Sequence, residues 1–339
     1  MVAFNVLESD AFSMASMTEG LDSVDYKPSL LGSLGIFEPE PVRTQDVFID
    51  RRDGDINLIQ TSERGAPAAE LNRETRNMVG LKTVRLAKSS TLMAHEIAGI
   101  RAFGQESELQ SVAVEFARRN ARLVQDMEYT KEKHRLGALQ GLLLDADGST
   151  IYDFNTEFGE SATAEIDFEL DDDTTDVRAK CNAVVRGMAV SSRGAMGTGA
   201  TVHALAGDEF YDDLIKHPQV RQTYLNWAAA ADLREGMAYK AFTYGGITFH
   251  NYRGSDDGTE IAVGATKAKF FPVGAQGIFK EVMSPADEFM PYVGAMGQSM
   301  YAMRELDPSG LQQWVRAHVR AYPLFVCQKP RVLRSAKNA

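Results

Sequence analysis

The chain has 339 residues and a formal net charge of −11 at pH 7, and 44% of its residues are hydrophobic and 24% charged. A chain of this length and composition buries a substantial core, and we expect two or more lobes. The acidic balance argues against a protein that reads nucleic acid, because such proteins bind phosphates with an excess of Lys and Arg. The sequence has no apolar run of the roughly 18–20 residues that a membrane span needs, so we expect no membrane partner.

The N-terminal segment, residues 1–36, mixes Ser, Gly, Asp and scattered apolar residues. It lacks the basic start and the continuous apolar core of a secretory signal, so we expect it to remain on the mature protein. Nothing in its pattern predicts a core of its own. We therefore interpret residues 1–36 as an N-terminal arm.

Residues 37–95 have the pattern of a long two-stranded loop. Thr44–Ile49 and Ile56–Thr61 are strand-like and flank the turn-forming stretch DRRDGD, and GLKTVRLAKSS (residues 80–90) alternates apolar and polar residues again. Between them, ERGAPAAELNRETRN (residues 63–77) carries charges of both signs and no large apolar residue except Leu71. A loop of this length without structure of its own is usually functional or disordered.

A long amphipathic helix is predicted from Ser107 to Leu144. Ser107 and Gln110 have the spacing of a capping box, and apolar residues then recur mostly at intervals of three, four and their sums. No Pro interrupts the run before DADG at residues 145–148. A coiled coil would explain the length, but the heptad repeat is not kept through RRNARLVQDMEYTKEKH. We therefore predict a strut, with one stripe against a sheet and the other side facing solvent or a neighbour.

The remaining pattern predicts a compact α/β lobe at residues 171–285, inserted into a discontinuous second unit. STIYDFNTE (residues 149–157) and EIDFEL (residues 165–170) are predicted strands before it. Inside the lobe we predict a buried strand in TGATVHALAG (residues 198–207), a hairpin around Gly245–Gly246, and helices at Asp176–Ala189, 208–217 and Pro218–Glu235. The predicted strands that return to the first sheet are Tyr301–Leu306, Trp314–Arg320 and Leu324–Cys327. The fold class is α+β.

Several short motifs resemble metal-binding or phosphate-binding motifs, but their residues do not have the required spacing or context. DADG lacks the third ligand before its Gly and the bidentate Glu of an EF-hand, and HEIAG (residues 95–99) lacks the second His of a zinc protease helix. GAMGTGA (residues 194–200) is glycine-rich, but it precedes a strand where a phosphate loop follows one. The two cysteines, Cys181 and Cys327, form no CxxC pair, which indicates a reducing cytoplasm without a zinc site or disulfides. We predict no catalytic residue, no cofactor and no metal.

The C-terminal tail is basic between Arg316 and Lys337, where six Lys and Arg residues occur without an acid. Two interpretations stay open at this point. The tail is a solvated basic edge, or it contacts an acidic partner surface.

Four segments together resemble a known family. They are RGAPA (residues 64–68), IAGIRAFG (residues 97–104), LLDADGSTIYDFNTEFG (residues 143–159) and YPLFVCQKPRVL (residues 322–333). In this order and spacing they resemble the major capsid proteins of tailed bacteriophages, and more narrowly the lambda-type capsid protein E family. The likeness spans most of the chain, but the middle, residues 171–285, carries little of it.

The resemblance implies the phage capsid fold of the Hong Kong 97 type. It implies an N-terminal arm at 1–36, an E-loop at 37–95, a P domain at 96–170 and 286–339 with its spine helix at 107–144, and an A domain at 171–285. The implied function is that of a major head protein, not an enzyme. The resemblance implies that it assembles through hexamers and pentamers into an icosahedral shell around double-stranded viral DNA.

The resemblance also implies partners and a location. The chain itself is the first partner. The sequence shows no long helical prodomain, which implies a separate scaffolding protein; a portal, a decoration protein and weak non-specific contact with DNA are further expectations. The protein is expected in the virion capsid, after assembly in the host cytoplasm.

We hypothesise that residues 63–77 lie over the adjacent subunit. An arm of paired strands without an apolar face is not stable in isolation, and charge pairs across the boundary would hold it. The candidate contact residues are Arg64, Gly65, Pro67, Glu70, Arg73, Glu74 and Arg76. Two other functions stay open: the shell protein of an encapsulin-like nanocompartment, and an acidic cytoplasmic α/β enzyme with its site in residues 171–285.

Overall fold

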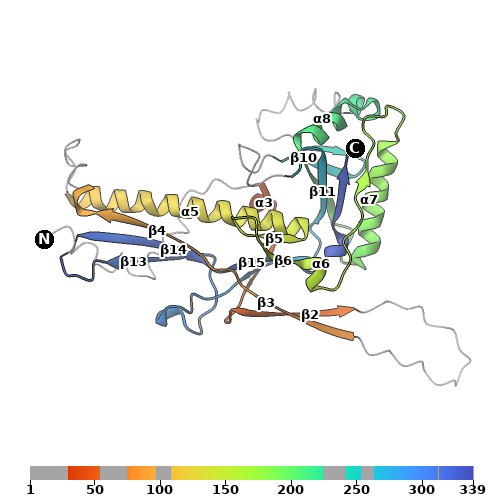
Figure 1. Cartoon of the computed structure of the whole chain (residues 1–339). Coiled ribbons are helices and arrows are strands. Elements are labelled where there is room, and N and C mark those ends of the chain that lie inside the picture. Colours follow the sequence, from red (N-terminus) through yellow and green to blue (C-terminus); the bar gives the residue numbers. More distant parts are fainter. Residues whose placement is uncertain are drawn as a thin grey trace, which may run out of the picture.

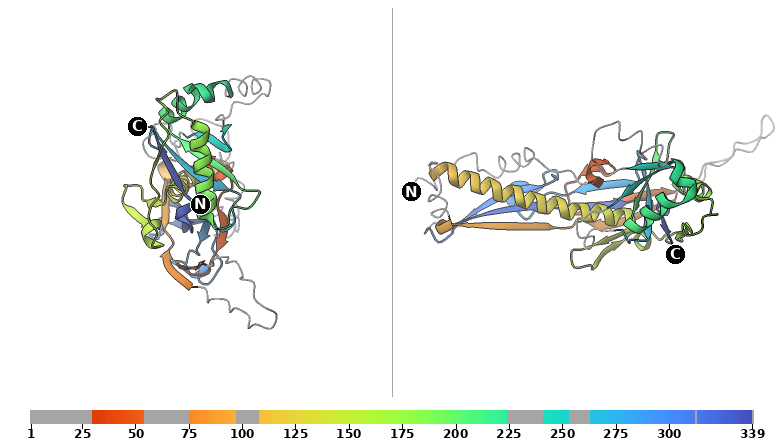
Figure 2. Two further views of the ribbon diagram at one scale, coloured as in Figure 1. Left: turned by 90° about the vertical axis from the view of Figure 1, so that its right-hand side faces the viewer. Right: turned by 90° about the horizontal axis from the view of Figure 1, so that it is seen from above.

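A computed structural model describes residues 30–53, 75–96, 108–223, 241–252, 263–311 and 313–338. One long helix, α5 (Glu108–Gln140), lies along a narrow sheet at one end of the molecule and reaches a wider sheet at the other (Figure 1). A two-stranded hairpin projects from the junction of these two parts. Seen from above, the molecule is elongated along the helix axis (Figure 2).

Helix α5 packs on a three-stranded antiparallel sheet in the order β13-β14-β4. The strands are β4 (Leu86–Met93), β13 (Tyr301–Leu306) and β14 (Trp314–Ala321). Alternate residues of β14 are buried, and Val315, Ala317 and Val319 meet Phe116 and Leu123 of the helix. Burial of these side chains stabilises the pair at about 25 cal/mol per Å² of apolar surface. The predicted strut against a sheet is confirmed.

The helix ends at Gln140, four residues before the predicted end at Leu144. Gly141 has a φ of +80°, a left-handed conformation that reverses the chain. The next residues form β5 (Leu142–Leu144), which pairs with β6 (Thr150–Asp153). A side chain at Gly137 would put its Cβ 2.8 Å from the Leu142 carbonyl oxygen, so this glycine lets β5 lie against the helix. The helix begins at Glu108, and the predicted cap Ser107 lies outside the described residues.

The predicted strand at residues 149–157 is only half correct. Asp153 caps a short helix, α6 (Phe154–Glu157), because its carboxylate accepts the Asn155 N–H at 3.0 Å and the Thr156 hydroxyl at 2.8 Å. The predicted strand at 165–170 is reduced to β7 (Ile166–Asp167).

The wider sheet has six strands in the order β7-β16-β11-β8-β10-β9. Its strands include β8 (Thr201–Ala206), β9 (Phe242–Tyr244), β10 (Ile247–Asn251), β11 (Lys267–Val273) and β16 (Arg334–Lys337). The helices of this part include α7 (Val177–Ser192) and α8 (Asp208–Lys216), and α7 stands beside the sheet (Figure 1). The predicted hairpin at Gly245–Gly246 is confirmed by the antiparallel pairing of β9 with β10. Of the predicted helix Pro218–Glu235, residues 218–223 are helical and the rest lies outside the described residues.

Two elements cross the boundaries expected for an inserted lobe at 171–285. The C-terminal strand β16 lies between β7 and β11 in the six-stranded sheet. Conversely, β12 (Phe279–Met283) pairs with β1 (Glu38–Pro41) and β15 (Pro323–Cys327) in a separate sheet. In that sheet β1 is an edge strand, parallel to β12, and the Val42 N–H donates to the Met283 carbonyl at 2.8 Å.

The hairpin consists of β2 (Asp46–Asp53) and β3 (Thr75–Lys82), which run antiparallel and pair only with each other among the described strands. The turn predicted in DRRDGD is wrong at its start, because residues 50–53 continue β2 opposite residues 75–78. The predicted strand Ile56–Thr61 lies outside the described residues.

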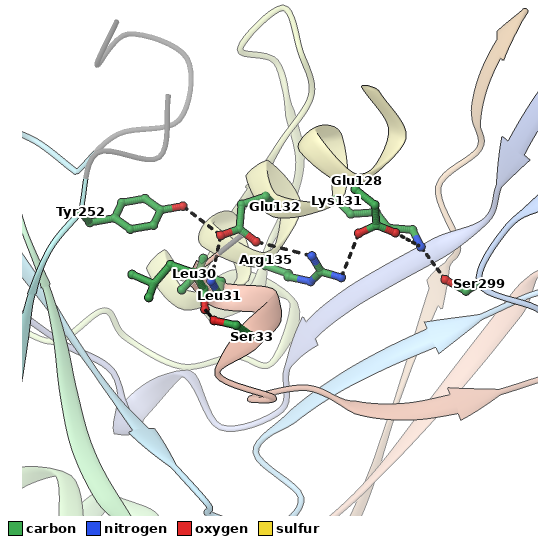
Figure 3. A network of polar contacts seen from close by, with 9 residues as sticks. All are labelled: Leu30, Leu31, Ser33, Glu128, Lys131, Glu132, Arg135, Tyr252 and Ser299. Atoms are coloured by element: carbon green, nitrogen blue, oxygen red, sulfur yellow. Dashed lines mark hydrogen bonds and ion pairs between the residues drawn. The ribbon is translucent and has the colours of Figure 1, made fainter. Parts of the chain in front are cut away.

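Four charged side chains of α5 form a buried network (Figure 3). Lys131 is 1% exposed, and its ammonium donates to the Glu128 carboxylate at 3.2 Å. The Arg135 guanidinium pairs with Glu128 and Glu132, each at 3.5 Å. Buried charges are tolerated when they are paired, and here two cations face two carboxylates.

The network joins the helix to three distant segments (Figure 3). The Glu132 carboxylate accepts the backbone N–H of Leu31 at 2.9 Å, which attaches the short helix α3 (Leu30–Ser33) to α5. The same carboxylate accepts the Tyr252 hydroxyl at 3.4 Å, at the end of the wider sheet. Lys131 donates to the Ser299 hydroxyl at 2.7 Å. The network therefore holds the two parts of the molecule and helix α3 in one arrangement.

We expect Glu132→Gln to lower the free energy of unfolding by about 3–5 kcal/mol, since it leaves two buried cations of this network against one carboxylate. Asp126→Asn on the same helix is the matched control. Asp126 pairs with Lys88 at the surface, so its loss should cost about 0–1 kcal/mol. Chemical denaturation of both variants measures the difference. Equal stability of the two variants would contradict a structural role for the network.

Two histidines form a second polar cluster, in the six-stranded sheet. His203 Nδ1 and His250 Nε2 share a hydrogen bond of 2.9 Å, and the rings stack with centroids 5.2 Å apart. Burial lowers the pKa of His250 to about 4, with a further contribution from His203, and burial lowers the pKa of His203 as well. Both rings are therefore neutral in the folded protein near pH 7.

Because the folded-state pKa values lie below the ordinary 6.5, the unfolded chain binds protons first as the pH falls. We expect stability to decrease from about pH 6.5 toward pH 4. In His250→Gln, which keeps a hydrogen-bonding group, the decrease between pH 7 and pH 5 should be smaller. Thermal unfolding at the two pH values measures it. An unchanged pH dependence in the variant would refute the assignment.

Candidate inter-subunit surfaces

Most of the predicted contact residues fall outside the described part of the chain. These are Arg64, Gly65, Pro67, Glu70, Arg73 and Glu74. The seventh, Arg76, lies in β3 opposite Arg52, and the structure describes its backbone only. The structure therefore describes the base of the hairpin.

The inner face of the hairpin is fixed to the body. Val47, Ile49 and Leu81 are buried in a cluster with Leu143 and Phe325. At the end of β3 the Lys82 N–H donates to the Tyr152 hydroxyl at 2.9 Å, and this hydroxyl donates to the Lys82 carbonyl at 3.2 Å. These contacts fix the orientation of the hairpin base relative to the body.

The outer face of the hairpin carries two exposed apolar residues. Phe48 is 67% exposed and Met78 is 65% exposed, on the face opposite to the buried residues. Phe48 faces Gly80 across the strands, and a Cβ at Gly80 would lie 3.4 Å from the Phe48 ring. Phe48, Met78 and Gly80 form what we call the hairpin patch. Asp46 and Lys82, at its border, pair with each other at 3.8 Å.

A second apolar surface lies on residues 284–300, the loop between β12 and β13, which we call the β12–β13 loop. Met290 is 90% exposed, Val293 60% and Met296 47%. The sequence from residue 289 to residue 300, FMPYVGAMGQSM, carries no charge. Interface cores are depleted in charge and enriched in Met, so this composition is typical of a contact surface.

Aromatic rings pack against the β12–β13 loop. The rings of Tyr292 and Tyr301 meet edge to face with centroids 4.8 Å apart, and Tyr301 meets Tyr322 at 6.0 Å in the same way. The Arg320 guanidinium lies over the Phe289 ring, 4.5 Å from its centroid. These contacts fix Phe289 and Tyr292, the neighbours of Met290 and Val293 in the chain, and Arg43 Nε contacts Met296 Sδ at 3.3 Å.

Charge pairs and a glycine fix the same loop to the base of the hairpin. Glu288 pairs with Arg85 and Arg320, and Gln45 donates to the Asp287 carboxylate at 2.8 Å. A Cβ at Gly297 would come within 2.0 Å of the Met283 carbonyl oxygen, so no other residue fits there. These contacts attach the loop to the body of the same chain.

The basic tail is paired within the chain. Arg316, Arg320, Arg331 and Lys337 form ion pairs with Glu305, Glu288, Glu160 and Asp167. Arg334 donates to the Gly187 carbonyl at 2.8 Å and to the Ser191 hydroxyl at 2.7 Å, so it holds the end of α7. These contacts account for the charge run without an acidic partner.

Within the described ranges, no three His, Cys, Asp or Glu side chains are grouped to hold a metal ion. None of the described helices is both long and apolar enough to cross a membrane. Both cysteines are buried, and burial raises the pKa of each thiol to about 12, which makes them poor nucleophiles.

Sequence reasoning missed both apolar surfaces. The alternation in β2 places Val47 and Ile49 on one face, and a large apolar residue between them, Phe48, then has to face the other way. An uncharged run as long as residues 289–300 is a second available signal.

Comparisons with known proteins agree with this architecture. The sequence profile of the family described as phage major capsid protein E matches residues 13–338. The major capsid protein of Salmonella phage Felix O1 is 25% identical over 360 residues, covering 96% of each chain. That of Pseudomonas phage KPP10 is 27% identical over 318 residues, covering 88% of this chain and 90% of the relative.

Among solved structures, the capsid asymmetric unit of Cyanophage A-1(L) aligns with a TM-score of 0.51 and 11% identity, over 93% of this chain and 94% of that one. The likeness confirms the expected phage capsid fold of the Hong Kong 97 type. With a profile match that extends from residue 13 to residue 338, the chain belongs to the phage major capsid protein E family.

Proposed function

We propose that this capsid protein assembles through hexamers and pentamers into an icosahedral shell that encloses double-stranded viral DNA. The family match over residues 13–338 carries the proposal. The net charge of −11 supports it, because an acidic wall encloses DNA without binding its phosphates tightly. The two phage relatives favour a phage head over a nanocompartment, and the family favours a structural role over an enzyme.

We assign the parts of the chain to the parts of a capsid subunit. Residues 1–36 are the N-terminal arm, 37–95 the E-loop, 96–170 and 286–339 the P domain, and 171–285 the A domain. Strand β16 completes the A-domain sheet from outside that range, and β12, inside the range, pairs instead with β1 and β15. Helix α5 is the spine helix.

The proposed partners follow from the same assignment. Copies of the chain form the capsomers in the host cytoplasm, and a separate scaffolding protein, a portal and a decoration protein complete the particle. The contact residues in 63–77 pair with charges of the adjacent subunit. Each such pair contributes about 0–1 kcal/mol, and repetition over a closed shell makes the sum large.

The purified protein should form rings or shells, visible by size-exclusion chromatography and negative-stain microscopy. Capsomer contacts are heterologous, so they close into rings instead of stopping at a dimer. A discrete monomer or dimer at every concentration and salt condition would overturn the proposal.

Deletion of residues 63–77 should leave a folded, soluble monomer and abolish shells, since the hairpin base is held by its own core contacts. A variant in which a Gly-Ser linker of equal length replaces these residues separates chain length from side-chain chemistry, and it should also fail to assemble. Normal particles from the linker variant would show that the seven contact candidates are not needed.

A further inference from the structure

We propose that helix α3 is a latch at the junction of the two parts of the molecule. In the position that the structure describes, it fixes the angle between the narrow sheet and the wider sheet, and its release lets this angle change. The proposal rests on the proposed function, in which identical chains form both hexamers and pentamers. A ring of six and a ring of five need different rotations between neighbours, and an adjustable junction inside the subunit supplies that difference.

The first argument is the place of α3 in the core. The helix lies beside α5, close to the wider sheet (Figure 1). Leu31 is almost completely buried, in one cluster with Leu136 of α5 and Phe271 of the wider sheet. Leu30 and Leu34 pack against the same cluster. Helix α3 therefore adds apolar contacts to α5 and to the sheet at once, and these contacts oppose a rotation of one against the other.

The second argument is an acceptor that α3 shares with the wider sheet (Figure 3). The buried Glu132 carboxylate of α5 accepts the Leu31 N–H at 2.9 Å and the Tyr252 hydroxyl at 3.4 Å. A buried acceptor that loses a donor is costly, so the carboxylate favours the arrangement in which both donors are in place. Release of α3 therefore weakens the junction at the same group that binds Tyr252.

The third argument is that α3 can detach without unfolding its neighbours. It is a single turn, LLGS, which is too short to be stable without its packing. Gly35 follows with a φ of +57°, and a Cβ at this position would meet no atom within 4 Å. The next segment is held separately, because the Phe37 ring packs on Phe279 and Phe325 with centroids 5.4 and 5.2 Å away. Rotation at Gly35 can therefore release α3 while β1 stays in its sheet.

Distances between two spin labels, one on each part, test the latch. Leu311, in the turn between β13 and β14, is 70% exposed, and Val190 of α7 is 79% exposed. Both native cysteines are buried, so the variant Val190→Cys/Leu311→Cys provides two accessible thiols for labelling. The labelled full-length chain is diluted with unlabelled wild-type chain, so that distances within one subunit dominate. Before assembly, pulsed electron paramagnetic resonance should give one narrow distance distribution.

Leu31→Ala in this labelled background should broaden the distribution or shift its maximum, because α3 then loses its buried side chain. Leu92→Ala is the matched control. Leu92 is buried to a similar degree, but in the core between α5 and the narrow sheet, so the distribution should stay unchanged. Particles assembled from Leu31→Ala should also vary more in diameter than particles from Leu92→Ala, as negative-stain microscopy measures.

A second pair of variants acts on α3 without changing the core, should Leu31→Ala prevent folding. Gly35→Ala disfavours the left-handed backbone that the latched position requires, and its methyl group meets no neighbouring atom. Gly35→Asn is the control, because Asn tolerates this conformation. The distribution should therefore broaden more in Gly35→Ala than in Gly35→Asn.

The outcomes separate the latch from the proposed function. Unchanged distances in both Leu31→Ala and Gly35→Ala overturn the latch and leave the proposed function intact. Equal broadening in Leu31→Ala and Leu92→Ala indicates a general loss of stability and also overturns it. Altered distances in particles of wild-type diameter refute the connection between the junction and the ring geometry. If the wild-type chain forms no particles at all, the proposed function itself fails.

Discussion

Helix α5 is the element on which the rest of the structure depends, because it contributes to three separate hydrophobic cores. Its first half covers the narrow sheet through Phe116, Leu123 and Met127. Its second half supplies Leu136 and Leu139 to the core of the wider sheet, while Ala138 faces the base of the hairpin. A change in the direction of this helix would therefore move all three parts at once. The buried charges at its centre add directional contacts where apolar packing alone would allow sliding.

The hairpin and the β12–β13 loop illustrate how a subunit is made ready for contact. Each has one side fixed by its own core and another side with exposed apolar residues. In a monomer the exposed sides are only a liability, since they invite association. A member of the capsid E family acts as part of a shell, and association with other subunits then adds to the stability of each subunit.

Much of this fold could be predicted from the sequence where local patterns decide the structure. The alternation in Tyr301–Leu306 and around Trp314 specified strands correctly, and the Gly245–Gly246 turn specified a hairpin. The errors arose where contacts between segments distant in the sequence determine the secondary structure. Residues 50–53 remain in a strand because residues 75–78 pair with them, and β16 joins a sheet whose other strands are far away in the sequence.

The candidate site could be predicted less well than the fold. The charge pattern of the sequence pointed to residues 63–77. To predict the exposed apolar residues, one must also know which face of each strand is buried against the body. Phe48 is informative only once Val47 and Ile49 are seen to be buried. In the same way, the chain can reverse at Gly141 because Gly137 leaves room for the backbone of Leu142 against the helix. The spacing of apolar residues in the sequence does not reveal this contact.

The edge strand β1, with the sequence EPEP, bears on how such a protein avoids unlimited growth. The Val42 N–H points to β12, so by alternation the amides of Glu38 and Glu40 also face inward, and the outward positions are Pro39 and Pro41. Proline has no amide hydrogen, so this margin offers no donors to a foreign strand. A foreign strand added at this border would therefore receive no hydrogen bond from β1, which disfavours fibrous growth there.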